Sequence, residues 1–206
     1  MARFFDVHPD NPQARSIQQI GHMLTQDALI AYPTDSGYAL GCRMDYHEGV
    51  DRIRRIRQLS DKHHFTLMCA DFAQLGYLVM LSNTAFRAIK ASTPGPYTFI
   101  LPATAEVPRR LAHAKKKTVG VRIPQHAISL AIVKELGEPM LTSTLLLPGM
   151  DQPLTSGWEI NELLGQQVDA IVEGGDVLAQ ASTVVDYSQG YPQVLRYGAG
   201  DASRFE

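Results

Sequence analysis

Five short segments of the sequence combine hydroxyl side chains, arginine and glycine, the groups that bind anions. They are residues 32–38 (YPTDSGY), 118–122 (TVGVR), 142–144 (TST), 182–183 (ST) and 196–198 (RYG). Arginine binds a carboxylate or a phosphate through two parallel hydrogen bonds, and hydroxyl groups add further donors. The segments therefore predict a site for phosphate or carboxylate oxygens.

Each of these segments also has a purely structural interpretation. Thr34 and Ser36 suit a turn in which hydroxyl groups bond to the nearby backbone. Arg122 lies in the apolar string VGVRIP, so if it is buried it needs a ligand or a carboxylate of the protein as its partner. Ser182 and Arg196 also fit ordinary polar residues at strand ends. The combination of segments, rather than any one of them, favours a binding site.

Several familiar catalytic and cofactor motifs are missing from the sequence. It holds no GxxxxGK[ST] or GxGxxG motif, so neither a P-loop nor a dinucleotide fingerprint is predicted. None of Ser36, Ser143 and Ser182 lies in the GxSxG pattern of a serine hydrolase. His63 and His64 are adjacent, which does not bring two imidazoles to one metal on a helix. We expect no protein-built metal site and no tightly bound cofactor, with Mg²⁺ entering only together with ATP.

The composition is that of an ordinary folded protein. The chain has 206 residues, and 19 Lys and Arg against 21 Asp and Glu give a net charge of −2, which excludes a strongly basic nucleic-acid binder and a polyanion. A chain of this length buries about 70% of its unfolded surface in one core, so we expect a single domain over residues 1–206. Two cysteines, a polar amino terminus and no long apolar run predict a cytoplasmic protein that does not span a membrane.

Hydrophobic spacing predicts an alternation of strands and helices. Strands are expected at 28–32, 38–42, 65–70, 97–101, 118–123, 139–145, 170–172, 183–186 and 193–196, and helices at 71–78, 82–90, 108–114, 127–136 and 158–164. A further helix is expected to start at Asn11 and Pro12, an N-cap followed by proline. Another runs from Tyr46 to Arg57, with an apolar face and a basic face. The alternation indicates one α/β domain with a mixed sheet.

Six motifs give the chain a resemblance to a known family. The strings YPTDSGYALGC, TPGPYTFILPA, TVGVRIP, LTSTLLLPG, ASTVVDYS and VLRYGAG occur in the order and spacing of the YrdC/YciO family, over residues 16–200. The resemblance implies a YrdC-type α/β fold, a twisted mixed β-sheet flanked by helices with a concave basic cavity. Members of the family make threonylcarbamoyl-AMP from threonine, bicarbonate and ATP for the modification of tRNA. Others are described as binding double-stranded RNA.

The resemblance also implies roles for single residues. The positions that resemble threonine-binding residues are Thr34, Arg122 and Ser182, with Arg122 meeting the carboxylate of the amino acid. The positions that resemble ATP-binding residues are Thr118, Ser143 and Arg196. Such roles agree with the chemistry, since a carboxylate suits a fixed guanidinium and a triphosphate suits arginine with hydroxyl donors.

The sequence departs from the synthase pattern in two motifs. Synthases that resemble this chain carry a KxR and an SxN motif, which fall here on residues 57–59 and 143–145. Leu59 and Leu145 therefore replace two polar groups, while Arg57 remains and Lys62 is a possible substitute cation for the nucleotide. One lost charge-assisted contact costs about 3 to 4 kcal/mol of transition-state stabilisation. We expect weak or absent synthase activity.

Two basic clusters provide a possible RNA-binding surface. They comprise Arg52, Arg54 and Arg55 on the expected helix and Lys115, Lys116 and Lys117 in a loop. A solvated helix face and a solvated loop explain the same residues.

Three functions follow from the sequence. The first is a protein that binds RNA (tRNA or double-stranded RNA) and ATP or another AMP-containing molecule, as a monomer or weak homodimer, with little synthase activity. The second is an active threonylcarbamoyl-AMP synthase, and the third is an enzyme that removes the threonylcarbamoyl group from tRNA.

Overall fold

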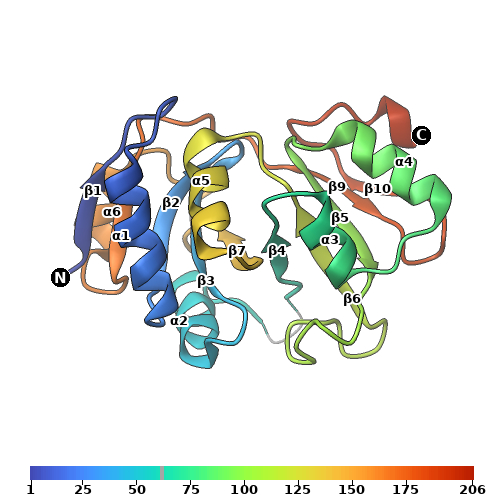
Figure 1. Cartoon of the computed structure of the whole chain (residues 1–206), viewed down its shortest axis with the longest axis horizontal. Coiled ribbons are helices and arrows are strands. Elements are labelled where there is room, and N and C mark those ends of the chain that lie inside the picture. The colour runs from blue at the N-terminus through green and yellow to red at the C-terminus, as the bar shows by residue number, and fades with distance from the viewer. Residues whose placement is uncertain (61–62) are drawn as a thin grey trace.

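One mixed β-sheet runs through the whole molecule (Figure 1). The computed structural model describes residues 1–60 and 63–206. The strands are β1 (Arg3–Asp6), β2 (Ile30–Thr34), β3 (Gly37–Arg43), β4 (Thr66–Met68), β5 (Tyr97–Pro102), β6 (Thr118–Arg122), β7 (Met140–Thr144), β8 (Ala170–Glu173), β9 (Thr183–Asp186) and β10 (Gln193–Arg196). Their order across the ten-stranded sheet is β1-β8-β2-β3-β7-β4-β6-β5-β9-β10.

Parallel and antiparallel pairs alternate irregularly in this sheet. The pairs β1 and β8, β8 and β2, β4 and β6, and β5 and β9 are parallel. The other neighbours are antiparallel, including the hairpin of β2 and β3, in which Thr34 pairs with Gly37 across a two-residue turn. The expected mixed α/β sheet is confirmed.

Six α-helices of the described residues flank the sheet. They are α1 (Ala14–Thr25), α2 (His47–Arg57), α3 (Phe72–Leu78), α4 (Asn83–Ser92), α5 (Ala127–Leu136) and α6 (Gly157–Leu164), followed by a short 3-10 turn at Ser203–Phe205. In Figure 1, α1 and α5 lie side by side over the half of the sheet that holds β2, and α3 and α4 lie over the half that holds β5.

The apolar side chains divide into two clusters that lie on opposite faces of the sheet near β2. The smaller one joins the buried face of α1, with Ile17, Ile20 and Leu24, to α5 and to Tyr32 of β2. The larger one contains apolar residues of α2, α3, α4 and α6. Burial of one stripe of each helix fixes the helix against the sheet. Within the described ranges, no helix is long and apolar enough to cross a membrane.

Three local expectations were wrong. The segment 108–114 is a series of turns rather than a helix, because Nδ1 of His113 accepts the backbone N–H groups of Lys115 and Lys116 and the chain turns back there. The first helix starts at Ala14, not at Asn11, because the backbone N–H of Asn11 bonds to Nδ1 of His8 in a preceding turn.

The third error is the omission of β1. This four-residue strand lies at the amino terminus and is defined by its parallel pairing with β8. Strand formation therefore depends here on a partner more than 160 residues away in the chain.

Candidate functional site

A cavity of about 310 Å³ lies where the central strands meet the end of α2. Strands β3 to β7 and β9 contribute Ala39, Thr66, Thr98, Ile100, Gly120, Arg122, Thr142, Ser143, Thr144 and Val184 to its lining. The remaining lining residues come from segments at strand and helix ends, namely Arg57, His63, His64, Phe65, Leu146, Asp151, Pro153, Ala181, Ser182 and Arg196. The cavity thus collects arginine and hydroxyl side chains from distant parts of the sequence.

Strand alternation places Arg122 in the cavity. On β6, Val119 and Val121 enter the larger apolar cluster, whereas Gly120 and Arg122 line the cavity on the other side of the strand. Arg122 is only 5% exposed. A guanidinium buried to this extent requires partners for its charge and its donors.

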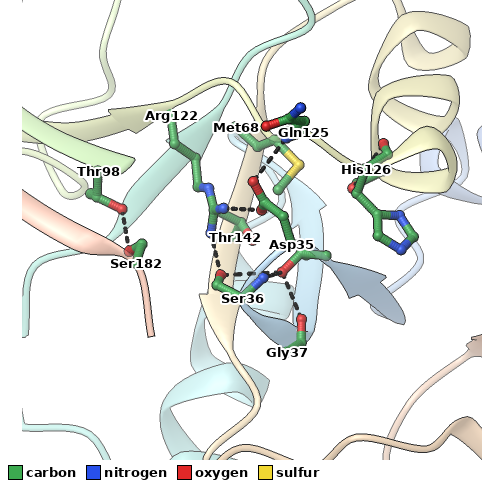
Figure 2. A network of polar contacts seen from close by, with 12 residues as sticks. Asp35, Ser36, Gly37, Met68, Thr98, Arg122, Gln125, His126, Thr142 and Ser182 are labelled. Atoms are coloured by element: carbon green, nitrogen blue, oxygen red, sulfur yellow. Dashed lines mark hydrogen bonds and ion pairs between the residues drawn. The ribbon is translucent and has the colours of Figure 1, made fainter. Parts of the chain in front are cut away.

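The turn between β2 and β3 supplies those partners (Figure 2). One Nη of Arg122 forms an ion pair with the carboxylate of Asp35, and the other donates to Oγ of Ser36 at 2.8 Å. The second oxygen of Asp35 accepts the backbone N–H of Gln125 at 2.8 Å. Nε of Arg122 is buried and has no hydrogen-bond partner among the described residues.

Thr34 serves the same turn. Its hydroxyl donates to the carbonyl of Gly37 at 2.6 Å and accepts the backbone N–H of Ser36 at 3.1 Å. Thr34 is 1% exposed and is not among the cavity-lining residues. In the structure, the Thr34 hydroxyl therefore forms hydrogen bonds to the backbone of the turn, as expected for a purely structural residue.

Arg57 closes one side of the cavity from the end of α2. Its Nη1 donates to Oγ of Ser143 at 2.6 Å, and its Nε donates to the carbonyl of Leu146 at 3.3 Å. Both partners are uncharged. Burial lowers the pKa of Arg57, which means that an anion in the cavity would find a partly desolvated cation there.

Arg196 occupies another side of the cavity with two hydroxyl groups. Its guanidinium donates to the carbonyl of Ser182 at 2.9 Å and to Oγ of Ser182 at 3.1 Å. Oγ of Ser182 also lies 2.9 Å from the hydroxyl of Thr98 (Figure 2). Burial, and to a smaller extent the charge of Arg122, lower the pKa of Arg196.

Two histidines of the lining are poor proton acceptors. Burial, followed by the positive charges of Arg57, His64 and Arg54, lowers the pKa of His63 to about 4. Burial and the neighbouring charge on His113 lower the pKa of His64. At neutral pH the positive charge of the lining therefore resides on its arginines.

The structure brings five of the eight predicted binding residues to this cavity: Arg57, Arg122, Ser143, Ser182 and Arg196. Thr34 and Thr118 are not among its lining residues. The hydroxyl of Thr118 is buried without a hydrogen-bond partner in the described part of the chain. Lys62 lies outside the described residues.

Leu59 and Leu145 do not line the cavity; both pack against the larger apolar cluster. Leu145 is fully buried there, and its backbone N–H donates to the carbonyl of Tyr38 at 2.8 Å. Three successive residues of β7, Thr142, Ser143 and Thr144, line the cavity, whereas Leu145 follows the end of this strand and is absent from the lining.

The six residues of the expected RNA-binding surface differ in their contacts and in their exposure to solvent. Arg52 is ion-paired with Asp169 at 2.6 Å, Arg54 lies over the ring of Phe65, and Arg55 lies in a separate groove with Gln167. Lys115, Lys116 and Lys117 are exposed. They follow His113, whose ring stacks on His64 of the cavity lining at 4.5 Å.

The sequence interpretation missed Asp35 and Thr98. Asp35 was visible as a carboxylate in a tight turn, and an arginine in an apolar strand is a reason to look for such a partner. Thr98 could not be recognised as a site residue from the sequence, because threonine is common in strands and Ser182, its hydrogen-bond partner, is 84 residues away in the chain. Across residues 1–60 and 63–206, no group of three His, Cys, Asp or Glu side chains is arranged to hold a metal ion.

Comparisons with known proteins identify relatives of the chain. The family model Sua5_yciO_yrdC, described by the words telomere recombination, matches residues 22–198. The YciO protein of Escherichia coli K12 is 47% identical over 205 residues, 100% of each chain. The threonylcarbamoyl-AMP synthase of Vibrio vulnificus YJ016 is 32% identical over 162 residues, 77% of this chain and 86% of the synthase.

Solved structures give the same result. The crystal structure of E. coli YciO matches with a TM-score of 0.96 over 100% of both chains at 47% identity. P. abyssi Sua5 complexed with L-threonine matches with a TM-score of 0.87 at 26% identity, over 95% of this chain and 57% of that protein. The chain therefore belongs to the Sua5/YciO/YrdC family, which is related to threonylcarbamoyl-AMP synthesis.

Proposed function

We propose that the cavity binds an adenine nucleotide or a threonylcarbamoyl-adenosine group, and that threonylcarbamoyl-AMP synthase activity is weak or absent. The observation on which this proposal depends is that two cavity arginines have only uncharged hydrogen-bond partners in the described structure. Arg57 and Arg196 have hydroxyl and carbonyl partners, and neither has a carboxylate partner in the described part of the chain. Their charges are therefore available to an anionic ligand.

Anion binding follows from the surroundings of these two side chains. Each guanidinium is partly desolvated by burial, which lowers its pKa. A phosphate or carboxylate in the cavity would restore the favourable interactions that burial removed, and charge-assisted hydrogen bonds are the strongest available. Mg²⁺ would enter with a triphosphate, held mainly by the phosphate oxygens.

Weak synthase activity follows from what the cavity lacks. The resemblance to synthases implies polar groups at the positions of Leu59 and Leu145, and both leucines pack against the apolar cluster instead. Arg122, which the resemblance assigns to the carboxylate of threonine, already pairs with Asp35. Each missing charge-assisted contact costs about 3 to 4 kcal/mol, or on the order of a hundred- to a thousandfold in rate.

The ligand class is supported by relatives of this chain. The Vibrio relative is named a threonylcarbamoyl-AMP synthase, and the P. abyssi protein was crystallised with L-threonine. These two names apply to the relatives only. They indicate that threonylcarbamoyl-AMP and L-threonine are the first small molecules to test for binding to this cavity.

Nucleotide binding tests the proposal. Arg57→Ala should weaken the affinity for AMP at least tenfold in isothermal titration calorimetry, because it removes a cation of the lining. The matched control is Arg55→Ala, which removes the same charge from the same helix at a residue that lies in a different groove. Equal losses in the two variants would contradict binding in this cavity, as would no AMP binding by the unmodified protein.

A second candidate function is removal of the threonylcarbamoyl group from tRNA. The observation in its favour is the stack of His113 on His64, which joins the loop of Lys115, Lys116 and Lys117 to the cavity lining. Exposed lysines beside a cavity suit a ligand that is part of a polynucleotide. Loss of the modification from tRNA on incubation with the protein would support this reaction over simple binding.

A further inference from the structure

We propose that Thr183 is a positioning residue of the cavity, which holds Arg196 and its partner Ser182 in place for an anionic ligand. Thr183 does not line the cavity itself. It acts through the chain that follows Arg196, because its hydroxyl ties residues 198–200 to the start of β9. The inference rests on the proposed function, since it concerns how the same cavity binds a nucleotide.

The first observation is the pair of hydrogen bonds formed by the Thr183 hydroxyl. It donates to the carbonyl of Gly200 at 2.6 Å and accepts the backbone N–H of Gly198 at 3.0 Å. Thr183 is fully buried. Its neighbour Val184 lines the cavity, so strand alternation directs the Thr183 side chain to the opposite face of β9. One hydroxyl thus fixes two points of the C-terminal segment against this strand.

The second observation is how closely the same segment packs on the residues before β9. The backbone N–H of Ala199 donates to the carbonyl of Ala181 at 2.9 Å. A Cβ added to Gly198 would lie 2.2 Å from the carbonyl oxygen of Ala181 and 2.6 Å from that of Ser182, so a larger residue does not fit there. The segment therefore has almost no room to shift against the chain that carries Ser182.

The end of the segment is anchored as well. A Cβ added to Gly200 would lie 2.4 Å from the ring of Tyr97, which shows how near the two residues are. Phe205 is buried and packs against the rings of Tyr97 and Phe99, with centroids 5.8 and 5.7 Å apart. The chain after Arg196 is thus held by hydrogen bonds at Thr183 and by aromatic packing further on.

These contacts affect the cavity because Arg196 begins the segment that they hold. Its guanidinium donates to the carbonyl and to Oγ of Ser182 at 2.9 and 3.1 Å, and both residues line the cavity. A long side chain loses rotational freedom when it binds an anion, and the loss is smaller when its position is already fixed. By fixing the backbone on both sides of this contact, Thr183 directs the guanidinium of Arg196 into the cavity.

The test compares two variants that differ by one oxygen atom. AMP is titrated into full-length Thr183→Ala, Thr183→Ser and the unmodified protein by isothermal titration calorimetry. Thr183→Ala should weaken AMP binding at least tenfold, because the segment after Arg196 is no longer tied to β9. Thr183→Ser keeps the hydroxyl and should bind AMP within threefold of the unmodified protein. The control Thr93→Val removes a hydroxyl that bonds to the carbonyl of Ile89 outside the cavity lining, and it should change the affinity less than twofold.

A purely structural role for Thr183 predicts a different result when the variants are combined. In an Arg196→Ala background, Thr183→Ala should weaken AMP binding by less than a further threefold, since the guanidinium through which Thr183 acts is already absent. The same tenfold loss in both backgrounds would overturn the inference. So would equal AMP affinities of Thr183→Ala and the unmodified protein.

Hydrogen exchange of the unmodified protein decides the question if Thr183→Ala does not fold or if Arg196→Ala binds no AMP. Saturating AMP should slow the exchange of the backbone N–H groups of Gly198 and Ala199 at least threefold, although neither residue lines the cavity. Unchanged exchange of both groups would contradict a role of this segment in holding Arg196.

The same titrations separate this inference from the proposed function. AMP binding that depends on Arg57 and is unaffected by Thr183→Ala would reject the role of Thr183 alone. The absence of AMP binding by the unmodified protein would reject the proposed function and this inference with it.

Discussion

Three arginines line the cavity, and their partners differ in charge. Arg122 is paired with a carboxylate, whereas Arg57 and Arg196 contact hydroxyl and carbonyl groups. The sequence identified all three residues as candidates, Arg122 and Arg196 from polar segments at strand ends and Arg57 from the resemblance to the KxR motif of the synthases. It did not distinguish them, because the partner of Arg122 is 87 residues away in the chain. The sequence therefore predicted which arginines belong to the site, but it did not predict which of them has a carboxylate partner.

Leu145 provides a test at this scale. Leu145→Asn restores the polar residue of the synthase motif, and we expect it to lower the free energy of unfolding by about 3 kcal/mol, because a buried leucine is lost and an amide is buried without partners. Urea unfolding measures the change. Leu163→Asn, at a half-exposed position on α6, should cost about 0.5 kcal/mol through helix propensity alone. A stable Leu145→Asn protein with increased synthase turnover would mean that the residue faces the cavity.

The turn between β2 and β3 is the element that positions the site. It holds Thr34, Asp35 and Ser36 through side-chain contacts and ends at Gly37, whose φ of +92° favours glycine. The spacing of apolar residues predicted both flanking strands correctly, because buried strands have a strong sequence signal. The same reasoning failed for residues 108–114, where contacts of His113 with the backbone replace the helix.

Gly37 tests the importance of this turn. Gly37→Ala should destabilise the protein by about 1 to 3 kcal/mol, because alanine is strained at positive φ. Its Cβ would also lie 3.0 Å from Cβ of Pro153. The control is Gly76→Ala in α3, where an added Cβ meets nothing within 4 Å. That substitution should stabilise the protein by about 0.5 to 1 kcal/mol. Thermal and urea unfolding check both, and equal effects would refute the role of the turn.

Charge is distributed unevenly over the whole molecule. The chain has a net charge of −2, yet arginines gather at the cavity and three lysines follow one another in an exposed loop. The sequence predicted the fold class and the family from six ordered motifs. It could not predict which basic residues share a surface, because that depends on tertiary contacts such as the pairing of Arg52 with Asp169.

The lysine loop tests the importance of this distribution for RNA. The triple variant Lys115→Glu, Lys116→Glu and Lys117→Glu should weaken tRNA binding at least tenfold and flatten its salt dependence, since fewer counter-ions are released. Fluorescence anisotropy at two salt concentrations measures both. The control with the same change in charge combines Arg15→Glu, Arg87→Glu and Lys134→Glu, all at exposed positions outside the loop. Similar losses in the two triple variants would show that only total charge matters.

The most direct test of the proposed function is a mass-spectrometric assay of product formation. The purified protein is incubated with ATP, L-threonine and bicarbonate, beside an established threonylcarbamoyl-AMP synthase at the same concentration and beside Arg122→Ala. We predict that the unmodified protein forms threonylcarbamoyl-AMP at a rate at least a hundredfold below that of the synthase, in line with the loss of charge-assisted contacts. Turnover equal to that of the synthase, and abolished in Arg122→Ala, would contradict the account.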